Sequence, residues 1–496
     1  MCGLTPLWHL CWLLVLVLVG SAILMERLGG FLLDAVEPRP LESSRFRTVH
    51  QEQTMASIFK AYDIRGIYGK TLNEDLARKI GRAFVAFLGC RKVIVGRDMR
   101  PHSEPLFQAL ADGLMTQGAD VIDLGLVSTP MTYYANGTLG ADASIMLTAS
   151  HNPGEWNGFK LCREQAIPIS GATGIKDIEK IAMADRYPPV SRRGTLSRHE
   201  TVQAYVERIR QFADLRRPLR VAVDYSNGMG IVEGEVLRGL KNFEIDPLFD
   251  TLDGTFPNHE ANPLHEETWD ALRHKMQGGR YDLGLYFDGD ADRVGFMDEL
   301  GNIVTSDMVT ALVAEVILAR NPGAAIFYDL RSSWAVKEVI EENKGRPMMS
   351  RVGHAFIKQQ MREADALFAG ELSGHFYFKD NFFTESSALA ALYVANLVSQ
   401  GDKPLSELIK PIRRYVASGE INSEVHDTHA VLDRLRAKYA GQGRVIELDG
   451  FSVEFADWWF NVRASNTEPL IRLNLEAKTR SDMERHRDEL LALIRG

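Results

Sequence analysis

The sequence has few cysteines and no excess of basic charge. Its 496 residues include four cysteines, Cys2, Cys11, Cys90 and Cys162, which are too scattered for a disulfide framework or a zinc site. A reducing compartment is therefore expected. The net charge of -9 argues against a nucleic-acid partner, although a small anionic substrate needs only a local basic pocket. No proline-rich tract or block of like charge interrupts the chain, so a globular, multidomain protein is expected.

Basic residues are also missing ahead of the one long apolar run, residues 7–25. About 18 apolar residues reach the lower limit for a membrane-spanning helix, but a secretory signal would carry Lys or Arg before them. The arginines that follow, from Arg27 onward, would keep the body of an anchored protein on the cytoplasmic side. Alternatively, translation starts at Met25 or Met55 and the leader is a translation artefact, so that residues 1–54 do not all belong to the native protein. Both alternatives predict a cytoplasmic protein, and only the first anchors it to the inner face of a membrane.

Three similar stretches of the chain predict the fold class. In each, an apolar, β-branched run ends in an aspartate and leads into a helical pattern, as a buried strand does; these runs are residues 93–98, 221–224 and 326–329. In each, a second apolar run ends in a polar loop; these are residues 144–153, 283–293 and 367–375. Ligands of such sheets collect outside the carboxyl ends of the strands, where these loops fall.

The pattern changes near residue 411. Strands at 420–425, 446–455 and 460–463 surround a helix at 430–439, and a charged helix closes the chain. The sequence therefore predicts three similar mixed α/β domains plus a smaller C-terminal α+β domain around a central active-site cleft. After the extension of residues 1–54, the predicted domains are residues 55–195, 196–300, 301–412 and 413–496.

The first loop with candidate catalytic residues is formed by residues 148–153, Thr-Ala-Ser-His-Asn-Pro. An isolated serine such as Ser150 is more often a helix cap than a nucleophile. Here His151, Asn152 and the nearby Lys160 supply donors suited to a phosphoryl group, whereas nothing resembles the G-x-S-x-G turn of acyl hydrolases. Phosphoryl transfer fits this loop better than acyl transfer.

The second loop places Asp288, Asp290 and Asp292 at alternating positions. Side chains two apart in an extended segment point the same way, so the three carboxylates can converge on one cation. With Glu299 they also match part of an EF-hand, but Arg293 stands where that loop needs glycine, and the flanking runs look like strands. Magnesium, shared between these carboxylates and a phosphate oxygen, is the favoured ion. The alternative is a solvated acidic turn.

Two further loops are weaker signals taken alone. Residues 370–375 combine Glu371 and Ser373, which lie between two glycines, with the following His375; this set suits sugar hydroxyls and equally suits a helix cap. Residues 463–469 offer Arg463, Ser465, Asn466 and Thr467, a donor set that can hold a phosphate or belong to an ordinary surface turn.

Together and in this order, the four loops resemble the α-D-phosphohexomutase superfamily, most closely its phosphomannomutase/phosphoglucomutase group, from about residue 58 to the C-terminus. Residues 61–66, Ala-Tyr-Asp-Ile-Arg-Gly, are similar to the opening motif of the family. Two departures are visible: Ala291 replaces a glycine of the metal loop, and Arg331 lies where some relatives carry lysine. The leader has no counterpart in the family pattern.

The resemblance implies a role for each motif. Ser150 would be the phosphate carrier and, with the three aspartates, a ligand of one Mg²⁺ per chain. The residues implied in catalysis are Ser150, His151, Lys160, Arg65 and His354. Those implied in substrate binding are Tyr62, Arg293, Arg331, Glu371, Ser373, His375, Arg463, Ser465, Asn466 and Thr467.

The expected reaction interconverts hexose 1-phosphate and hexose 6-phosphate through a phosphoserine and a hexose 1,6-bisphosphate, which also serves as activator. Mannose and glucose differ only at C2, so a loop that binds the 3- and 4-hydroxyls accepts both. Leu372, at the variable position of that loop, resembles the hexose group of the family more than its phosphoglucosamine mutases, which remain one alternative. A metal-dependent sugar phosphatase and a non-catalytic sugar-phosphate sensor are the others. Whether the protein is a monomer or a dimer stays open.

Overall fold

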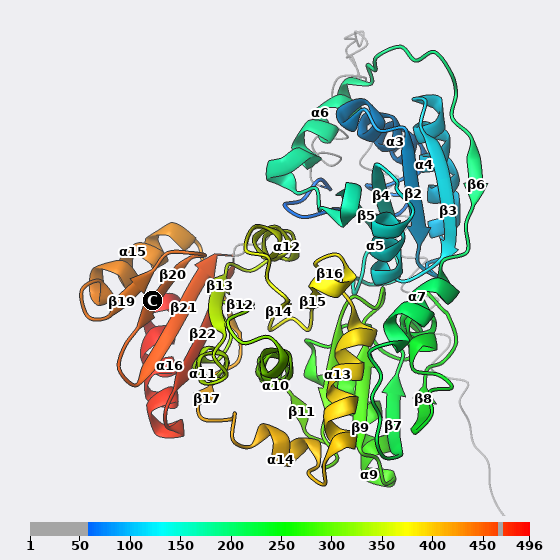
Figure 1. Ribbon diagram of the computed structural model, residues 1–496. Coiled ribbons are helices and arrows are strands. Elements are labelled where there is room, and N and C mark those ends of the chain that lie inside the picture. The colour runs from blue at the N-terminus through cyan, green and yellow to red at the C-terminus, as the bar shows by residue number, and fades with distance from the viewer. Residues whose placement is uncertain (1–57, 465–469) are drawn as a thin grey trace, which may run out of the picture. The chain divides into compact units, whose positions relative to one another are not determined.

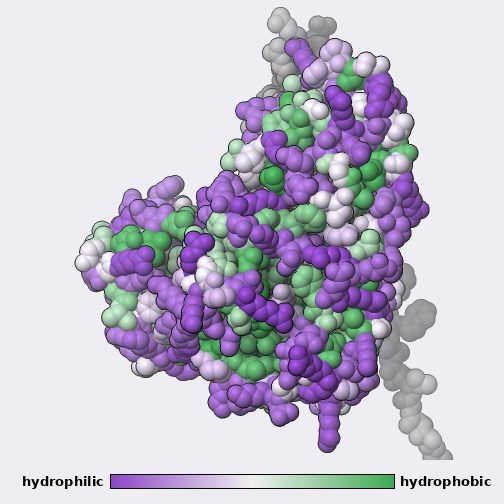
Figure 2. All heavy atoms as spheres, viewed as in Figure 1, coloured by the Kyte–Doolittle hydropathy of each residue, from purple (hydrophilic) through white to green (hydrophobic). Residues whose placement is uncertain are grey.

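The computed structural model describes residues 58–464 and 470–496 as a chain built on four β-sheets (Figure 1). The predictions for residues 1–54 and for Ser465, Asn466 and Thr467 lie outside the described residues. We call the parts of the chain that carry the four sheets domains I to IV. Within the described ranges no helix is both long and apolar enough to span a bilayer. Figure 2 shows hydrophilic and hydrophobic residues interspersed over the visible face.

Domain I contains a six-stranded sheet of order β1-β5-β4-β2-β3-β6. Strand β2 pairs in parallel with β3 and β4, and β5 runs antiparallel to β4. Helix α3 begins where the Asn73 side chain accepts the N–H of Leu76 and ends at Gly89, with φ 65°, as a capped helix should. The elements are β1 (Ile64–Ile67), α3 (Glu74–Leu88), β2 (Lys92–Arg97), α4 (Ser103–Thr116), β3 (Asp120–Leu126), α5 (Thr129–Thr138), β4 (Ala143–Leu147), β5 (Trp156–Arg163), η1 (Glu164–Ala166), η2 (Gly171–Ile175), α6 (Lys176–Ala184) and β6 (Leu196–Arg198).

Domain II repeats the central part of this arrangement in a sheet of order β11-β10-β9-β7-β8. Strand β7 is the middle one of three parallel strands, as β2 is in domain I; it pairs with β8 and β9, and β10 is antiparallel to β9. The elements are α7 (Val202–Arg210), β7 (Leu219–Asp224), α8 (Gly230–Glu233), η3 (Gly234–Val236), β8 (Phe243–Leu248), η4 (Glu266–Trp269), α9 (Asp270–Gly278), β9 (Leu283–Phe287), β10 (Val294–Met297) and β11 (Ile303–Val304).

Domain III has the same pairing pattern, with sheet order β13-β12-β14-β15-β16. Strand β12 is parallel to β13 and β14, and β15 is antiparallel to β14. The predicted threefold repetition is therefore confirmed. The elements are α10 (Ser306–Arg320), β12 (Ala325–Asp329), α11 (Trp334–Glu342), β13 (Arg346–Ser350), α12 (His354–Glu363), β14 (Phe368–Gly370), β15 (Phe376–Phe378), η5 (Lys379–Asn381), β16 (Thr384–Glu385), α13 (Ser387–Gln400) and α14 (Leu405–Ile409).

Domain IV is a six-stranded antiparallel sheet with two helices. The predicted closing charged helix is confirmed as α16, but a strand that the sequence analysis did not predict, β22, precedes it and pairs with β17, β18 and β21. The alternation of buried Ile471, Leu473 and Leu475 is the period-two pattern that identifies such a strand. The elements are β17 (Val416–Ala417), β18 (Ile421–Glu424), α15 (Thr428–Tyr439), β19 (Arg444–Ile446), β20 (Phe451–Glu454), β21 (Trp458–Ala464), β22 (Leu470–Ala477) and α16 (Arg480–Arg495).

The middle strands explain how the first three domains are joined. Successive side chains of a strand face opposite sides of its sheet. Ile94 on β2, Val221 on β7 and Ile326 on β12 all belong to one hydrophobic core, which runs through domains I, II and III. Their neighbours Val93, Ala222 and Phe327 face the separate cores behind each sheet. A continuous core of this kind fixes the loops of three domains relative to one another.

The buried carboxyl group of Glu233 lies where these three domains meet. It accepts hydrogen bonds from the Ser128 hydroxyl of domain I at 2.6 Å and from the Tyr205 hydroxyl at 2.7 Å. The backbone N–H of Ala388 in domain III donates to the same group at 3.3 Å. Burial raises the pKa of Glu233 to about 7, although these hydrogen bonds act in the opposite direction.

This raised pKa predicts a pH-dependent stability. A carboxyl group whose pKa is higher in the folded state binds more protons there, so stability falls as pH rises from about 4.5 to about 7. The loss amounts to roughly 3 kcal/mol, at 1.36 kcal/mol per pKa unit. In Glu233→Gln, whose side chain resembles the protonated acid, we expect a thermal midpoint above that of the wild type at pH 8 and close to it at pH 5. Scanning calorimetry at both pH values measures this difference.

The matched control is Glu235→Gln, since this neighbouring carboxylate is about half exposed and pairs with Arg238 at 3.2 Å. The difference in thermal midpoint between Glu235→Gln and the wild type should be the same at pH 5 and pH 8. A difference between Glu233→Gln and wild type that is equal at pH 5 and pH 8 would contradict the prediction.

Candidate active site

Ser150 lies after β4 in a segment that we call the serine loop, residues 148–156. Its side chain is buried, and its hydroxyl donates to Asp288 Oδ2 of domain II at 2.8 Å. Nδ1 of His151 lies 3.3 Å from the same hydroxyl oxygen. The backbone of Ser150 has φ 52°, a region that residues other than glycine seldom adopt, and its N–H donates to the Thr148 hydroxyl at 2.8 Å. The structure thus directs Ser150 toward the acidic residues of the next domain.

The acidic loop, residues 288–293, connects β9 and β10. These strands pair antiparallel, with Phe287 opposite Val294, so the flanks are strands, as predicted, and the EF-hand alternative is excluded. Asp288, Asp290 and Asp292 are all buried, and one oxygen from each lies within 4.8 Å of the others. The turn requires φ 58° at Ala291.

The donor set of the acidic loop fits a metal ion. Asp290 Oδ1 and Asp292 Oδ1 are buried and, among the described residues, accept no hydrogen bond. Unsatisfied carboxylate oxygens in a buried position are costly unless a cation compensates them. Oxygen ligands of this kind suit hard cations such as Mg²⁺. Asp288, Asp290 and Asp292 can therefore bind a metal, next to the Ser150 hydroxyl.

Cationic side chains of domain I partly neutralise this loop. Lys160 on β5 donates to Asp290 Oδ2 at 2.6 Å and also to Asp292. Burial and the neighbouring carboxylates raise the pKa of Asp288. Burial acts in the same direction on Asp292, but opposing effects, of which the charge of Lys160 is the largest, outweigh it and lower the pKa of that carboxyl.

Of the other predicted catalytic residues, Arg65 contacts the serine loop and His151 belongs to it. Arg65 on β1 donates to Ala149 O at 3.2 Å and to Asn152 Oδ1, and its Nε is bound to Asp63 at 2.6 Å. Burial and the charges of Arg293 and Arg65 lower the pKa of His151, which favours a neutral imidazole beside the serine.

The third loop, residues 370–375, lies against the acidic loop. His375 Nε2 is 3.3 Å from Asp292 Oδ1, and Arg293 Nε donates to the same nitrogen of His375 at 3.3 Å. The Ser373 hydroxyl lies 2.8 Å from His375 Nδ1. Glu371 accepts the N–H of Gly353 at 3.0 Å and a hydrogen bond from the Tyr377 hydroxyl. The predicted sugar-binding pair is thus fixed in place from several sides.

His354 and Tyr62 border the third loop. His354 begins α12, and its ring centroid lies 6.4 Å from that of His375 and 5.8 Å from that of Tyr62. The Tyr62 hydroxyl donates to Val352 O at 3.4 Å. Burial and the charge of Lys358 lower the pKa of His354.

Arg331 and Arg463 come together at the junction of domains III and IV. Arg331 forms a bidentate pair with Asp329, at 3.1 and 2.8 Å, and lies 3.6 Å from Glu420. Arg463, on β21, donates to Glu420 at 2.8 Å. One carboxylate therefore holds two guanidinium groups that were predicted to bind substrate.

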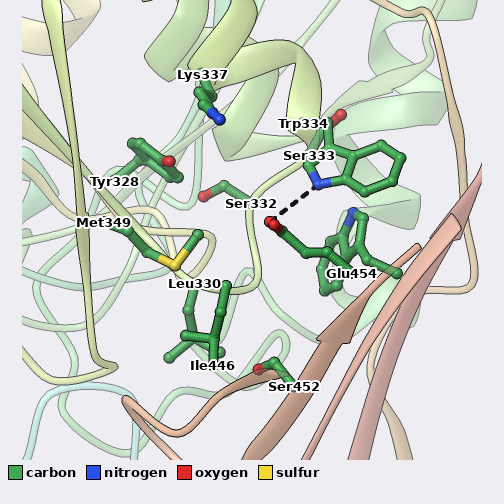
Figure 3. Close-up of a pocket in the computed structure, with 11 residues that line it drawn as sticks. Tyr328, Leu330, Ser332, Ser333, Trp334, Lys337, Met349, Ile446, Ser452 and Glu454 are labelled. Carbon is green, nitrogen blue, oxygen red and sulfur yellow. Dashed lines mark hydrogen bonds between the residues drawn. The ribbon is translucent and has the colours of Figure 1, made fainter. Parts of the chain in front are cut away.

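Domain IV makes further polar contacts with the N-terminal end of α11. The indole N–H of Trp334 donates to Glu454 at 3.2 Å, as Figure 3 shows, and its backbone N–H donates to Glu476 at 3.0 Å. The Ser332 hydroxyl lines the same pocket and has no partner among the described residues (Figure 3). These contacts fix domain IV to domain III on the side of β20 and β22.

Comparison with known proteins identifies this arrangement. Four phosphoglucomutase/phosphomannomutase family models match the chain in order: α/β/α domain I at residues 56–188, domain II at 203–301, domain III at 305–415 and the C-terminal domain at 420–493. The chain belongs to the phosphoglucomutase/phosphomannomutase family. Membership confirms the resemblance and the fold class predicted from the sequence, and it makes the chain a phosphohexomutase.

Members of this family from distant organisms are similar over nearly the whole chain. A phosphomannomutase of Escherichia coli is 41% identical over 459 residues, which are 89% of this chain and 100% of the relative. One from Methanocaldococcus jannaschii is 40% identical over 444 residues, 88% of this chain and 97% of the relative. The crystal structure of a phosphoglucomutase/phosphomannomutase family protein from Burkholderia thailandensis has a TM-score of 0.82 at 35% identity, covering 88% of this chain and 97% of that one.

Four other residues of this phosphohexomutase contact the site residues, and the local sequence marks only one of the four. The Thr129 hydroxyl donates to Asp290 Oδ2 at 2.6 Å. Tyr377 binds Glu371, Glu420 joins Arg331 to Arg463, and Arg100 holds the serine loop. That residue is Arg100. It stands two residues after Asp98, as Arg331 stands two residues after Asp329, and both aspartates come at the end of a predicted buried strand.

Proposed function

We propose that this phosphohexomutase interconverts the 1- and 6-phosphates of mannose, and also of glucose, with Ser150 as a reusable phosphate carrier. The observation that carries the proposal is the position of the Ser150 hydroxyl, buried and 2.8 Å from a carboxylate of a potential metal site. Further support comes from Lys160 of β5 and His151, which lie beside the acidic loop and the Ser150 hydroxyl. The metal, phosphoserine and individual residue roles are part of this proposal.

The proposed metal is one Mg²⁺, held by Ser150, Asp288, Asp290 and Asp292. When bound, it would neutralise the negative charge of the phosphorylated serine and polarise the transferring group. The hexose 1,6-bisphosphate is proposed as intermediate and activator. Hexose phosphates are the proposed small-molecule partners.

The chain's own residues would position the reacting groups. A hydroxyl of the hexose phosphate attacks the phosphorus of phosphoserine 150, the bond from phosphorus to Ser150 Oγ breaks, and the hydroxyl proton passes to a base of the chain. His151, His354, Lys160 and Arg65 are the proposed groups for proton transfer and charge stabilisation. Positioning and electrostatics of this kind account for most of the rate in phosphoryl transfer. After the bisphosphate turns over, its other phosphate returns to Ser150.

Substrate binding is proposed for two regions. Glu371 and Ser373, with Tyr62, His375 and Arg293 beside them, would bind the sugar hydroxyls. Arg331 and Arg463, together with Ser465, Asn466 and Thr467 outside the described residues, would bind the phosphate that is not transferred. Support for a shared phosphate comes from the Glu420 carboxylate, which lies 3.6 Å from Arg331 and 2.8 Å from Arg463. We retain residues 55–195, 196–300, 301–412 and 413–496 as the proposed domain limits.

A product assay tests the proposal. With Mg²⁺ and a trace of glucose 1,6-bisphosphate, we expect mannose 1-phosphate to yield mannose 6-phosphate with little free phosphate. Parallel reactions with glucose 1-phosphate and glucosamine 1-phosphate rank the substrates, and we expect glucosamine to be the poorest. Inorganic phosphate as the main product would instead identify a phosphatase, and no product from any of the three would refute the mutase activity.

A further inference from the structure

The guanidinium group of Arg100 lies beneath the serine loop with no exposed surface. Its Nη2 donates to Ser150 O at 2.8 Å and to Asn152 O at 2.6 Å. Its Nη1 donates to Pro153 O at 2.6 Å and to Trp156 O at 2.9 Å, and its Nε donates to Asp98 at 3.1 Å. A guanidinium has five N–H groups. All five are used, four of them on backbone carbonyls of one loop.

The residues around Arg100 fix it in this position. Asp98 Oδ1 accepts the backbone N–H of Arg100 at 3.2 Å and the Ser103 hydroxyl at 2.6 Å. The ring of His102 binds a further carbonyl of the loop, Gly154 O, at 3.0 Å. Arg100 and His102 together thus bind five backbone carbonyl groups of the serine loop.

The conformation held in this way is one that Ser150 would not keep unaided. A non-glycine residue with φ near +52° costs of the order of 1–3 kcal/mol and persists only when its surroundings enforce it. The acidic loop also packs closely against the backbone of Ser150, since a Cβ added at Gly289 would lie 2.3 Å from Ser150 O. A rotation of the Ser150 backbone would turn its hydroxyl away from Asp288.

The repeated fold offers a comparison within the same chain. Arg331 stands in the equivalent position of domain III, where Asp329 accepts its backbone N–H at 2.8 Å. Its guanidinium binds the carboxylates of Asp329 and Glu420. The Asp-x-Arg turn therefore does not by itself direct the arginine to a loop backbone. That contact is specific to Arg100.

We propose that Arg100 is a positioning residue for phosphoryl transfer, which keeps the Ser150 hydroxyl beside the acidic loop by holding the backbone carbonyls of the serine loop. The inference rests on the proposed function, because it concerns the rate of that reaction. Arg100 itself touches neither the acidic loop nor the proposed substrate groups in the contacts described above. Its substitution should therefore alter the chemical step more than substrate affinity.

Arg100→Lys tests the inference, because lysine keeps the charge but has three donors on a single nitrogen. We expect kcat for mannose 1-phosphate to fall on the order of 10²-fold, the effect of a misplacement of about 1 Å, with KM little changed. The matched control is Arg210→Lys. Arg210 also holds backbone carbonyls, donating to Val236 O at 3.0 Å and Glu235 O at 2.8 Å, but in domain II and away from the serine. Its substitution should lower the thermal midpoint and leave kcat unchanged.

Three outcomes would overturn the inference: a kcat for Arg100→Lys within about threefold of wild type, a loss expressed in KM alone, or an equal loss of kcat in Arg210→Lys. If Arg100→Lys does not fold, Asp98→Asn replaces it in the test. This variant keeps Arg100 but weakens the contact between its Nε and residue 98, and it should also lower kcat with KM little changed. A wild-type protein without mutase activity would overturn the proposed function and this inference with it. An active wild type with a normal Arg100 variant would overturn the inference alone.

Discussion

Ser150→Ala is expected to lower kcat for mannose 1-phosphate on the order of 10⁶-fold, as the loss of an enzyme's nucleophile does. Alanine cannot carry the phosphoryl group, so the two transfers of the cycle lose their common intermediate. The backbone contacts of the loop involve carbonyl groups and not the hydroxyl, so the fold should survive. A coupled assay of mannose 6-phosphate formation measures the loss, and intact-protein mass spectrometry shows whether the variant still accepts phosphate from glucose 1,6-bisphosphate.

Ser144→Ala is the matched control, because it removes a buried hydroxyl from β4, where it binds Asn136 at 2.7 Å, without touching the serine loop. We expect it to keep its kcat. Substantial turnover by Ser150→Ala, or a phosphate found on another residue, would reject Ser150 as carrier.

Loss of the metal is expected to have the second-largest effect. Treatment with a chelator should reduce mutase activity to the background level, and added Mg²⁺ should restore it, since buried carboxylates would then face the phosphate unneutralised. Asp290→Asn should weaken Mg²⁺ binding at least about 10²-fold, because even residues that only support metal ligands cost 10- to 100-fold. Isothermal titration with Mg²⁺ gives the affinity independently of turnover.

Asp298→Asn provides the comparison for this substitution. Asp298 lies in the next turn of domain II, where it accepts the N–H groups of Leu300 and Asn302 at 3.0 and 2.8 Å. Mg²⁺ affinity should be unchanged there. Full activity in the presence of chelator would mean that the acidic loop does not hold a required metal.

The sequence predicted those parts of the site whose residues are close together in the chain. Asp288, Asp290 and Asp292 form one short loop, and Ser150 and His151 are adjacent, so their chemistry could be inferred from local pattern. Thr129 and Asp290 are 161 residues apart, and Arg100 lies 50 residues before Ser150. Such contacts follow from how domains pack and from which side chains are buried, which a single sequence does not reveal. The β22 strand is different, because its alternating pattern was present in the sequence.

The structure also explains a departure from the family pattern that the sequence alone left open. Ala291 replaces a glycine, and it adopts φ 58°, a conformation that costs an L-residue about 1–2 kcal/mol. Its carbonyl accepts the Ser387 hydroxyl of domain III at 2.6 Å, which helps to hold the turn. The change therefore affects the stability of the acidic loop more than its three carboxylates.

The contact between Ser150 and Asp288 joins two domains, and it affects how the inactivity of a variant can be interpreted. Under the proposed function neither domain contains a complete site, so activity depends on the packing of one domain against the other as well as on the reacting groups. A substitution far from the loops, such as one in the shared core near Glu233, can silence the enzyme by parting the domains slightly while each stays folded. In a screen for inactive variants, such positions would be indistinguishable from catalytic residues until folding and metal binding were measured separately.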